Sequence, residues 1–108
     1  MIVAPKHLDV YRVQGVHLGH SKDIRPCIIC EVDSAGRLWG AVVSGQMDMF
    51  EGPPKHFKID REDPDFLFTG LTRTCYATGD VVEIHPNQLM AKLGILQGEL
   101  AKAFEKWC

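Results

Sequence analysis

The sequence predicts a small, mainly β domain that ends in one or two helices. Single Gly and Pro residues separate short apolar runs of about four to eight residues, which is typical of strands joined by turns. Near the C-terminus, large apolar residues recur at spacings of three and four, which is typical of a helix. With 108 residues the chain has room for one core, so we assign a single domain to residues 1–108. We expect a small barrel or strongly bent sheet packed by the amphipathic C-terminus.

The expected strands are bounded by turn residues. Pro26 lies near the start of the second strand, as a strand edge tolerates. The run Asp33-Ser34-Ala35-Gly36 predicts a hairpin turn, and the loop that contains Pro53 and Pro54 precedes a short strand. A further turn is expected at Gly79-Asp80. The predicted β segments are Leu8–Val16, Ile24–Val32, Leu38–Ser44, His56–Asp60, Phe66–Tyr76 and Val81–Ile84.

The C-terminal segment has the pattern of an amphipathic helix. Its apolar residues lie on one helical face: Leu89, Leu93, Leu96, Leu100, Phe104 and Trp107. Pro86 suits a first helical turn, whereas Gly94 is unfavourable inside a helix. We therefore predict a short helix up to Leu93, a break at Gly94, and a longer helix from about Gln97.

The composition is that of a soluble globular protein, with 45% hydrophobic and 24% charged residues. The net charge of −2 argues against nucleic-acid binding by bulk positive charge. Apolar stretches are far shorter than the roughly 20 residues of a membrane helix, and charged residues interrupt Met1–Tyr11 before a signal-peptide core forms. We expect a cytoplasmic protein with no membrane partner, whose four cysteines are free thiols.

Motifs for metal or cofactor chemistry are weak. Cys27 and Cys30 have a metal-ligand spacing, but residues three apart in a strand point to opposite faces. The five histidines include no HExxH pair, and the sequence has neither a phosphate-binding glycine loop nor a GxSxG motif. We therefore expect neither a metal nor a cofactor.

Polar residues at strand ends are the remaining candidates for chemistry. Arg25 lies where a loop enters the second strand, and Ser44 ends the third. If these strands form a hairpin, the start of one lies beside the end of the other. Arg25 and Ser44 are therefore expected at the same edge of the sheet, where a rigid rim can hold a charged group.

At these residues the chain resembles the MazF/PemK family of toxin endoribonucleases. The resemblance is carried by Gly19-His20, by Arg25-Pro26 with the apolar strand that follows, by Ala41–Gln46 and by Thr69–Arg73. Segments from Val82 to Leu100 also look like the family's terminal strand and helices. The resemblance extends from about Leu8 to Phe104 and implies an SH3-like barrel.

This resemblance implies a homodimer that cuts single-stranded RNA without metal, leaving a 2′,3′-cyclic phosphate and a 5′-hydroxyl, and that a cognate antitoxin protein neutralises. It implies that Arg25 stabilises charge on the phosphorane, that Ser44 hydrogen-bonds a phosphate oxygen, that Arg73 acts as an acid or electrostatic clamp, and that His20 transfers protons. The expected RNA-binding residues are Lys22, Gln46, Lys55 and Tyr76.

One position departs from the family pattern. Cys75 occupies the position where some PemK-like members have an aspartate and others a serine, which leaves the general base open. A second hypothesis is therefore a non-catalytic binding module, or a toxin that acts on a protein target as the related CcdB-like fold does.

Overall fold

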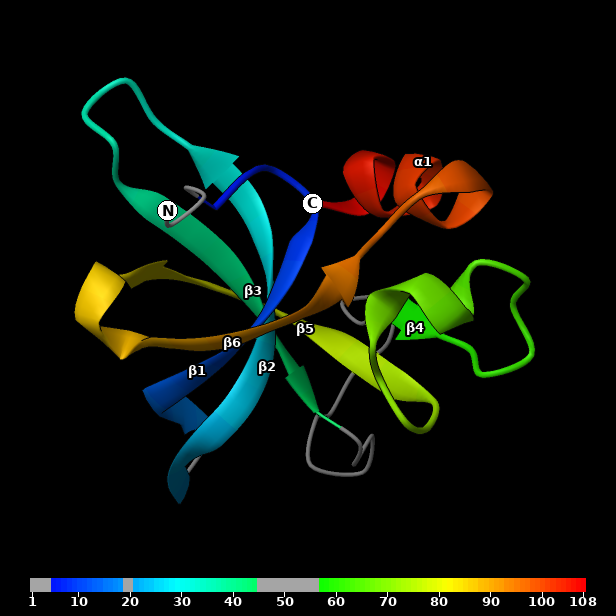
Figure 1. Cartoon of the computed structure of the whole chain (residues 1–108), viewed down its shortest axis with the longest axis horizontal. Coiled ribbons are helices and arrows are strands. Elements are labelled where there is room, and N and C mark those ends of the chain that lie inside the picture. Colours follow the sequence, from blue (N-terminus) through cyan, green and yellow to red (C-terminus); the bar gives the residue numbers. More distant parts are fainter. Residues whose placement is uncertain (1–4, 19–20, 45–56) are drawn as a thin grey trace.

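A computed structural model describes residues 5–18, 21–44 and 57–108. The chain forms a mainly antiparallel sheet of six strands followed by a C-terminal helix, which confirms the predicted mainly β class with a C-terminal helix (Figure 1). The strand order in the sheet is β4-β5-β3-β2-β1-β6. The elements are β1 (Asp9–Leu18), β2 (Ser21–Val32), β3 (Leu38–Ser44), β4 (Phe57–Ile59), the 3-10 helix η2 (Phe66–Thr69), β5 (Cys75–Ile84), the 3-10 helix η3 (Pro86–Gln88), β6 (Leu89–Ile95) and α1 (Gly98–Trp107).

Strands β2 and β3 form the predicted hairpin. The Asp33 carboxylate accepts hydrogen bonds from the backbone N–H groups of Ala35 and Arg37, and it forms a 2.7 Å ion pair with Nε of Arg37. The hydrogen bond from the backbone of Arg37 is the main cause that lowers the pKa of Asp33. Gly36 has a φ of +81°, a conformation that favours glycine, so the local sequence accounts for this turn.

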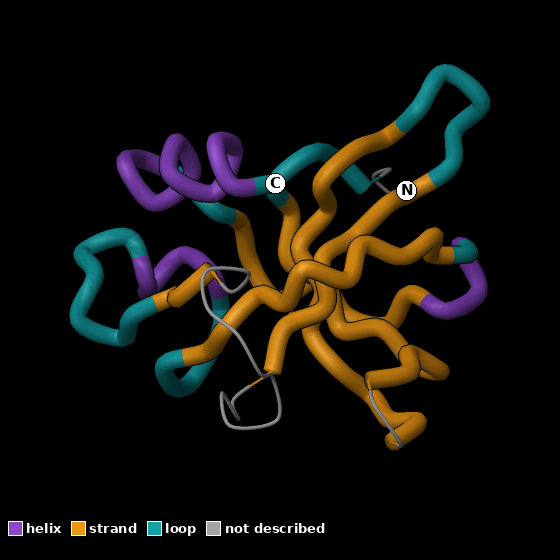
Figure 2. The backbone as a smooth tube through the Cα atoms, turned by 180° about the vertical axis from the view of Figure 1, so that it is seen from behind, coloured by secondary structure: helices purple, strands orange, loops and turns teal. Residues whose placement is uncertain are grey.

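The sheet curves strongly, as the tube view shows from behind (Figure 2). Within the described residues, β4 and β6 stand at the two ends of the strand order and do not pair with each other. The pairing therefore describes an open, bent sheet, and it does not close into the barrel that the resemblance implies.

Two hydrophobic clusters fill the two faces of this sheet. One face packs against α1, whose buried residues Leu100, Ala101 and Phe104 join a cluster with Val10 and Ile28. The opposite face has its own cluster, made of Tyr11, Val13, Cys27, Ile29, Leu38, Val42 and Ile84. Because the members of this second cluster come from the sheet itself, curvature of the strands is what shields them from water.

Helix α1 is held at both ends. Near its start, the backbone N–H of Leu100 donates to the Asp65 carboxylate at 3.4 Å, so an acidic residue from a distant loop stabilises the N-terminal turn. Towards its end, Phe104 and Trp107 pack with Phe57 of β4, with ring centroids 5.5 to 5.8 Å apart. The predicted helix from about Gln97 is confirmed.

The predicted short helix before Gly94 is wrong, because residues 89–95 form strand β6. This strand pairs with β1, with Val10 opposite Gly94 and Val13 opposite Leu89. A Cβ atom on Gly94 would lie 2.1 Å from the backbone oxygen of Phe68. Gly94 therefore lets η2 cross β6 at backbone contact, and it does not act as a break between two helices.

Two other predicted boundaries are also wrong. The first part of the predicted strand 66–76 forms η2 instead, and the predicted turn at Gly79-Asp80 lies inside the continuous strand β5. Strand β5 pairs with β3 from Ser44 opposite Tyr76 to Leu38 opposite Ile84. The register of this ladder shifts between Ala41, which pairs with Val81, and Val43, which pairs with Ala77, so the Gly79-Asp80 signal coincides with an irregularity inside β5 and not with a turn between two strands.

The cysteines divide into a disulfide pair and two buried thiols. Cys30 and Cys108 form a disulfide, so the prediction of free thiols is wrong for these two residues. Cys27 and Cys75 are free and buried. Cys27 belongs to the second cluster whereas Cys30 packs against the first, which confirms that they point to opposite faces of β2. No described helix has the length and apolar character needed to cross a bilayer.

Candidate functional site

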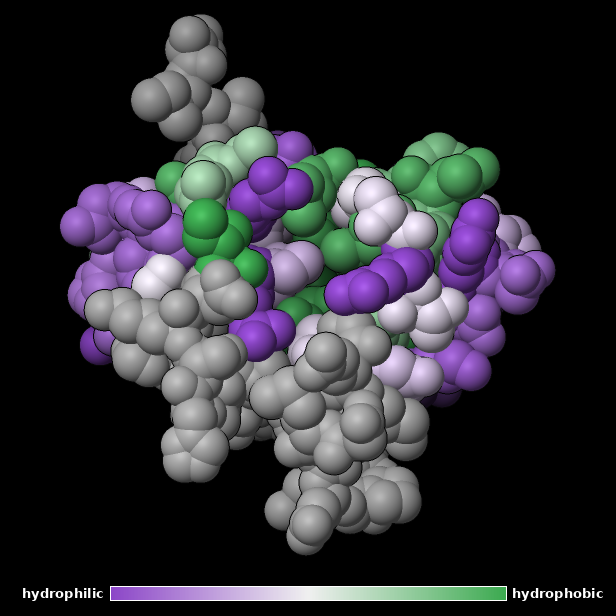
Figure 3. Space-filling view, turned by 90° about the horizontal axis from the view of Figure 1, so that it is seen from below, coloured by the Kyte–Doolittle hydropathy of each residue, from purple (hydrophilic) through white to green (hydrophobic). Residues whose placement is uncertain are grey.

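A cleft of about 310 Å³ lies where β2 begins, β3 ends and the chain approaches β5. It brings together three of the predicted catalytic residues, Arg25, Ser44 and Arg73. The other lining residues are Ile24, Pro26, Val43, Leu71, Thr72 and Cys75. Figure 3 views the molecule from below, and there hydrophilic side chains lie directly beside hydrophobic ones. The lining contains two guanidinium groups and no carboxylate among the described residues.

The register of the β2–β3 hairpin places Arg25 next to Ser44. Cys27 pairs with Val42, and Ile28 pairs with Ala41. In an antiparallel pair the same register, continued by two residues, places Arg25 opposite Ser44. Arg25 is half-buried and its Nε atom is shielded from solvent. Ser44 is only 3% exposed and lines the same cleft. The prediction that both residues reach one edge of the sheet is confirmed.

Arg73 reaches the cleft from a segment that follows η2. The Thr69 hydroxyl donates to the carbonyl of Phe66 at 2.7 Å and accepts from the N–H of Leu71 at 3.1 Å. Gly70 has a φ of +74°, and a Cβ atom there would lie 2.0 Å from the backbone oxygen of Leu93. This segment is therefore held tightly against β6, and Arg73, which follows it, is exposed and lines the cleft.

The Cys75 thiol is unsuited to the role of a general base. It is buried and its Sγ donates to the Arg73 carbonyl at 3.1 Å. Burial raises the pKa of Cys75, and the nearby Arg73 charge offsets only part of that increase. The thiol is therefore protonated at neutral pH, and the thiol form is a poor proton acceptor.

Tyr76 stands beside the cleft and does not line it. It pairs with Ser44 across β3–β5 and with Lys58 across β4–β5, and its side chain is half-buried. Directly paired residues share one face of a sheet, so Tyr76 places an aromatic ring and a phenol next to Ser44.

The remaining predicted site residues are not placed at the cleft. His20, Gln46 and Lys55 lie outside the described residues. The backbone of Lys22 belongs to β2 and pairs with His17 of β1, while its side chain is likewise outside the description.

A second cleft of about 370 Å³ adjoins the first and includes residues that the sequence reasoning missed. Both clefts are lined by Ile24, Pro26, Leu71 and Thr72. The second adds Arg12, Gly70, Met90 and Leu93. Thr72 lies inside the Thr69–Arg73 motif, so the sequence did contain a signal for Thr72 as a site residue. Arg12 is an exposed position in the alternating pattern of β1, and no motif singles it out.

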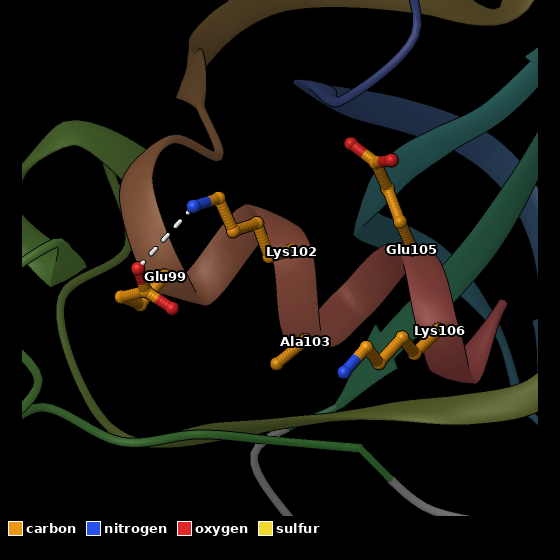
Figure 4. Close-up of a pocket in the computed structure, with 5 residues that line it drawn as sticks. All are labelled: Glu99, Lys102, Ala103, Glu105 and Lys106. Atoms are coloured by element: carbon orange, nitrogen blue, oxygen red, sulfur yellow. Dashed lines mark hydrogen bonds and ion pairs between the residues drawn. The ribbon is translucent and has the colours of Figure 1, made fainter.

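A hollow of about 580 Å³ lies along the solvent face of α1 and is a weaker candidate. Its lining residues all come from that one helix, and Lys102 and Glu99 neutralise each other in a 3.4 Å ion pair (Figure 4). A single helix face with paired charges gives a ligand few convergent groups. The described residues contain no group of three or more metal-ligating side chains.

No protein-family model matches the chain, and no curated protein matches it either. Two guanidinium groups and a hydroxyl around a small hollow provide hydrogen-bond donors for a tetrahedral oxyanion, and the planar fork of a guanidinium matches the oxygens of a phosphate.

Proposed function

We propose that the protein is a toxin endoribonuclease that cleaves single-stranded RNA without a metal ion. The observation that carries the proposal is the convergence of Arg25, Arg73 and Ser44 on one cleft without a carboxylate among its described lining residues. Sites for phosphate esters need such cationic donors, since charge builds on the non-bridging oxygens as phosphorus becomes five-coordinate.

The proposed reaction is an internal transesterification. The ribose 2′-oxygen attacks the adjacent phosphorus and its proton passes to a base. The bond from phosphorus to the 5′-oxygen then breaks, and that oxygen receives a proton. The products are a 2′,3′-cyclic phosphate and a 5′-hydroxyl. Arg25 and Arg73 stay charged at any working pH, so they stabilise the phosphorane as electrostatic clamps, and Ser44 donates to a phosphate oxygen.

The base is assigned by the chemistry of the remaining candidates. The raised pKa of the Cys75 thiol keeps it protonated. We propose His20 as the proton carrier, the role that the family resemblance implies, because imidazole exchanges protons near neutral pH. Lys22, Gln46, Lys55 and Tyr76 are proposed to hold the RNA on either side of the cut. The proposal includes a homodimer in the cytoplasm and an antitoxin protein that blocks the RNA site.

The first test is cleavage of a long single-stranded RNA in the presence and absence of EDTA. We expect equal cleavage and products with 5′-hydroxyl ends. Loss of activity on chelation, or 5′-phosphate ends, would show that the cyclising mechanism is wrong.

The second test separates chemistry from folding. Arg25→Ala is expected to lower the cleavage rate by roughly 10² to 10³, the value for one well-placed charge-stabilising donor. Cys75→Ala is expected to lower it by less than about tenfold, because a packed thiol contributes volume and no proton transfer. Arg61→Ala, at an exposed position outside both clefts, is the matched control and should leave the rate unchanged. Circular dichroism checks that each variant is folded.

One observation favours a second candidate function, a binding module without catalysis. None of the described residues that line the cleft has a carboxylate or an imidazole side chain. The described lining therefore contains groups that can bind phosphate and no group that accepts a proton at neutral pH. If Arg25→Ala weakens RNA binding while neither it nor the parent protein cleaves RNA, the binding module is the correct function.

A further inference from the structure

The second cleft is continuous with the first and crosses three strands. Arg12 of β1 pairs with Pro26 of β2, so their side chains share a face of the sheet. Met90 of β6 lines the same cleft from the other side of β1. Because Ile24, Pro26, Leu71 and Thr72 line both clefts, a ligand can extend from one into the other without leaving the surface.

Aliphatic side chains, partly exposed, form part of the wall of the second cleft, beside the polar residues Arg12 and Thr72. Ile24 is 50% and Met90 is 44% exposed, and Pro26, Leu71 and Leu93 complete an aliphatic lining. Apolar surface of this kind next to a phosphate site suits the flat face of a nucleobase, which gains by leaving water. The volume of about 370 Å³ is within the roughly 300 to 1,000 Å³ range of small-ligand sites.

The cleft also has a cation at its rim. Arg12 is exposed, and it makes no ion pair within the described part of the chain. Lys92, a neighbour on β6, is instead neutralised by Asp9 at 3.3 Å. Neither cleft has a carboxylate among its described lining residues, and three arginines, Arg12, Arg25 and Arg73, line the two joined clefts.

We propose that the second cleft is a nucleotide subsite that binds the residue of single-stranded RNA next to the scissile phosphate. Its base lies against Met90, Pro26 and Leu71, and its phosphate is held by Arg12. The inference rests on the proposed RNA substrate, and it assigns Arg12 and Met90 to RNA binding and to no chemical step. Aliphatic side chains and a single guanidinium match one nucleotide, whose base has poorly hydrated flat faces and is joined through the ribose to one negatively charged phosphate.

Binding is measured first, with a fluorescein-labelled single-stranded RNA whose 2′-hydroxyls are methylated so that it cannot be cleaved. At moderate salt, Arg12→Ala is expected to weaken binding about tenfold, the low end for a hydrogen bond to a charged group. A plot of log K against log salt should lose about 0.7 of its slope, the value for one phosphate contact on a single strand. Arg61→Ala is the matched control and should change neither quantity.

Base preference is measured next, by sequencing the products of a randomised RNA pool. Met90→Ser is expected to flatten the preference at one position beside the cut, and it should leave the salt slope unchanged because no charge is lost. Arg12→Ala should reduce cleavage of all sequences by a similar factor and leave the preference as it is.

The outcomes separate this inference from the proposed nuclease activity. If Arg12→Ala and Met90→Ser bind and cleave as the parent does while Arg25→Ala is inactive, the subsite is wrong and the nuclease stands. If the parent cleaves no RNA but binding still depends on Arg12 with the expected salt slope, the subsite stands and the nuclease is wrong. If Met90→Ser instead converts a dimer into a monomer in sedimentation and leaves RNA binding intact, the cleft is an interface between copies and the subsite is overturned.

Discussion

The disulfide between Cys30 and Cys108 joins β2 to the last residue of the chain, and its removal should lower stability strongly. The two cysteines are 78 residues apart in sequence, and closing a loop of that size in the unfolded chain costs about 4.5 kcal/mol by the chain-entropy relation. Cys108 is exposed, so Cys108→Ser removes the covalent link and little packing. The expected loss in the free energy of unfolding is thus about 4 kcal/mol as an upper value.

The assay is urea unfolding followed by tryptophan fluorescence, since Trp107 lies on the helix that the disulfide anchors. With a slope of about 1 to 2 kcal/mol per molar urea, the midpoint of Cys108→Ser should fall by about 2 to 4 M. Reductant should produce the same fall in the parent and no change in the variant. Equal midpoints without reductant, or four reactive thiols in the unfolded parent, would show that no disulfide between Cys30 and Cys108 stabilises the fold.

Two further predictions concern residues whose roles come from close packing. Gly94→Ala should lower the free energy of unfolding by about 2 to 3 kcal/mol because its Cβ would meet the Phe68 carbonyl. The control is Gly36→Ala, whose added Cβ would have no atom within 4 Å but whose φ is +81°. It should lower the free energy of unfolding by about 1 kcal/mol, and both variants are compared with the parent in thermal melts. Burial raises the pKa of Cys27 from 9.0 to about 12, so the folded thiol stays neutral where the unfolded one ionises. Stability should be constant below pH 9.0 and fall as the pH rises towards 12, by about 1.4 kcal/mol at pH 10, and Cys27→Ala should lack this fall. A parent whose urea midpoint shows the same pH dependence as the variant, or a Gly94→Ala melt equal to that of Gly36→Ala, would contradict these assignments.

Local patterns in the sequence were sufficient for several elements. The turn at Asp33–Gly36 and the hairpin around it depend on contacts between residues at most a few positions apart, such as those between Asp33 and Arg37. The hairpin alone brings Arg25 and Ser44 together, so the sequence predicted the proximity of two of the three predicted catalytic residues that line the cleft. The helix Gly98–Trp107 was equally predictable, because its apolar face repeats with the helical period over its whole length.

The tertiary structure decided the elements whose partners are distant in sequence. Leu89 and Leu93 fit a helical spacing, yet the strand β1 offers residues 89–95 a ladder of backbone hydrogen bonds, and Gly94 makes room for η2. The link from Cys30 to Cys108 and the approach of Arg73 to Arg25 likewise join segments that no short-range pattern connects. The spacing of apolar residues indicates only the local preference of the backbone. Strand pairing and packing across the sheet contribute more free energy, so they determine which conformation forms and which side chains share a cleft.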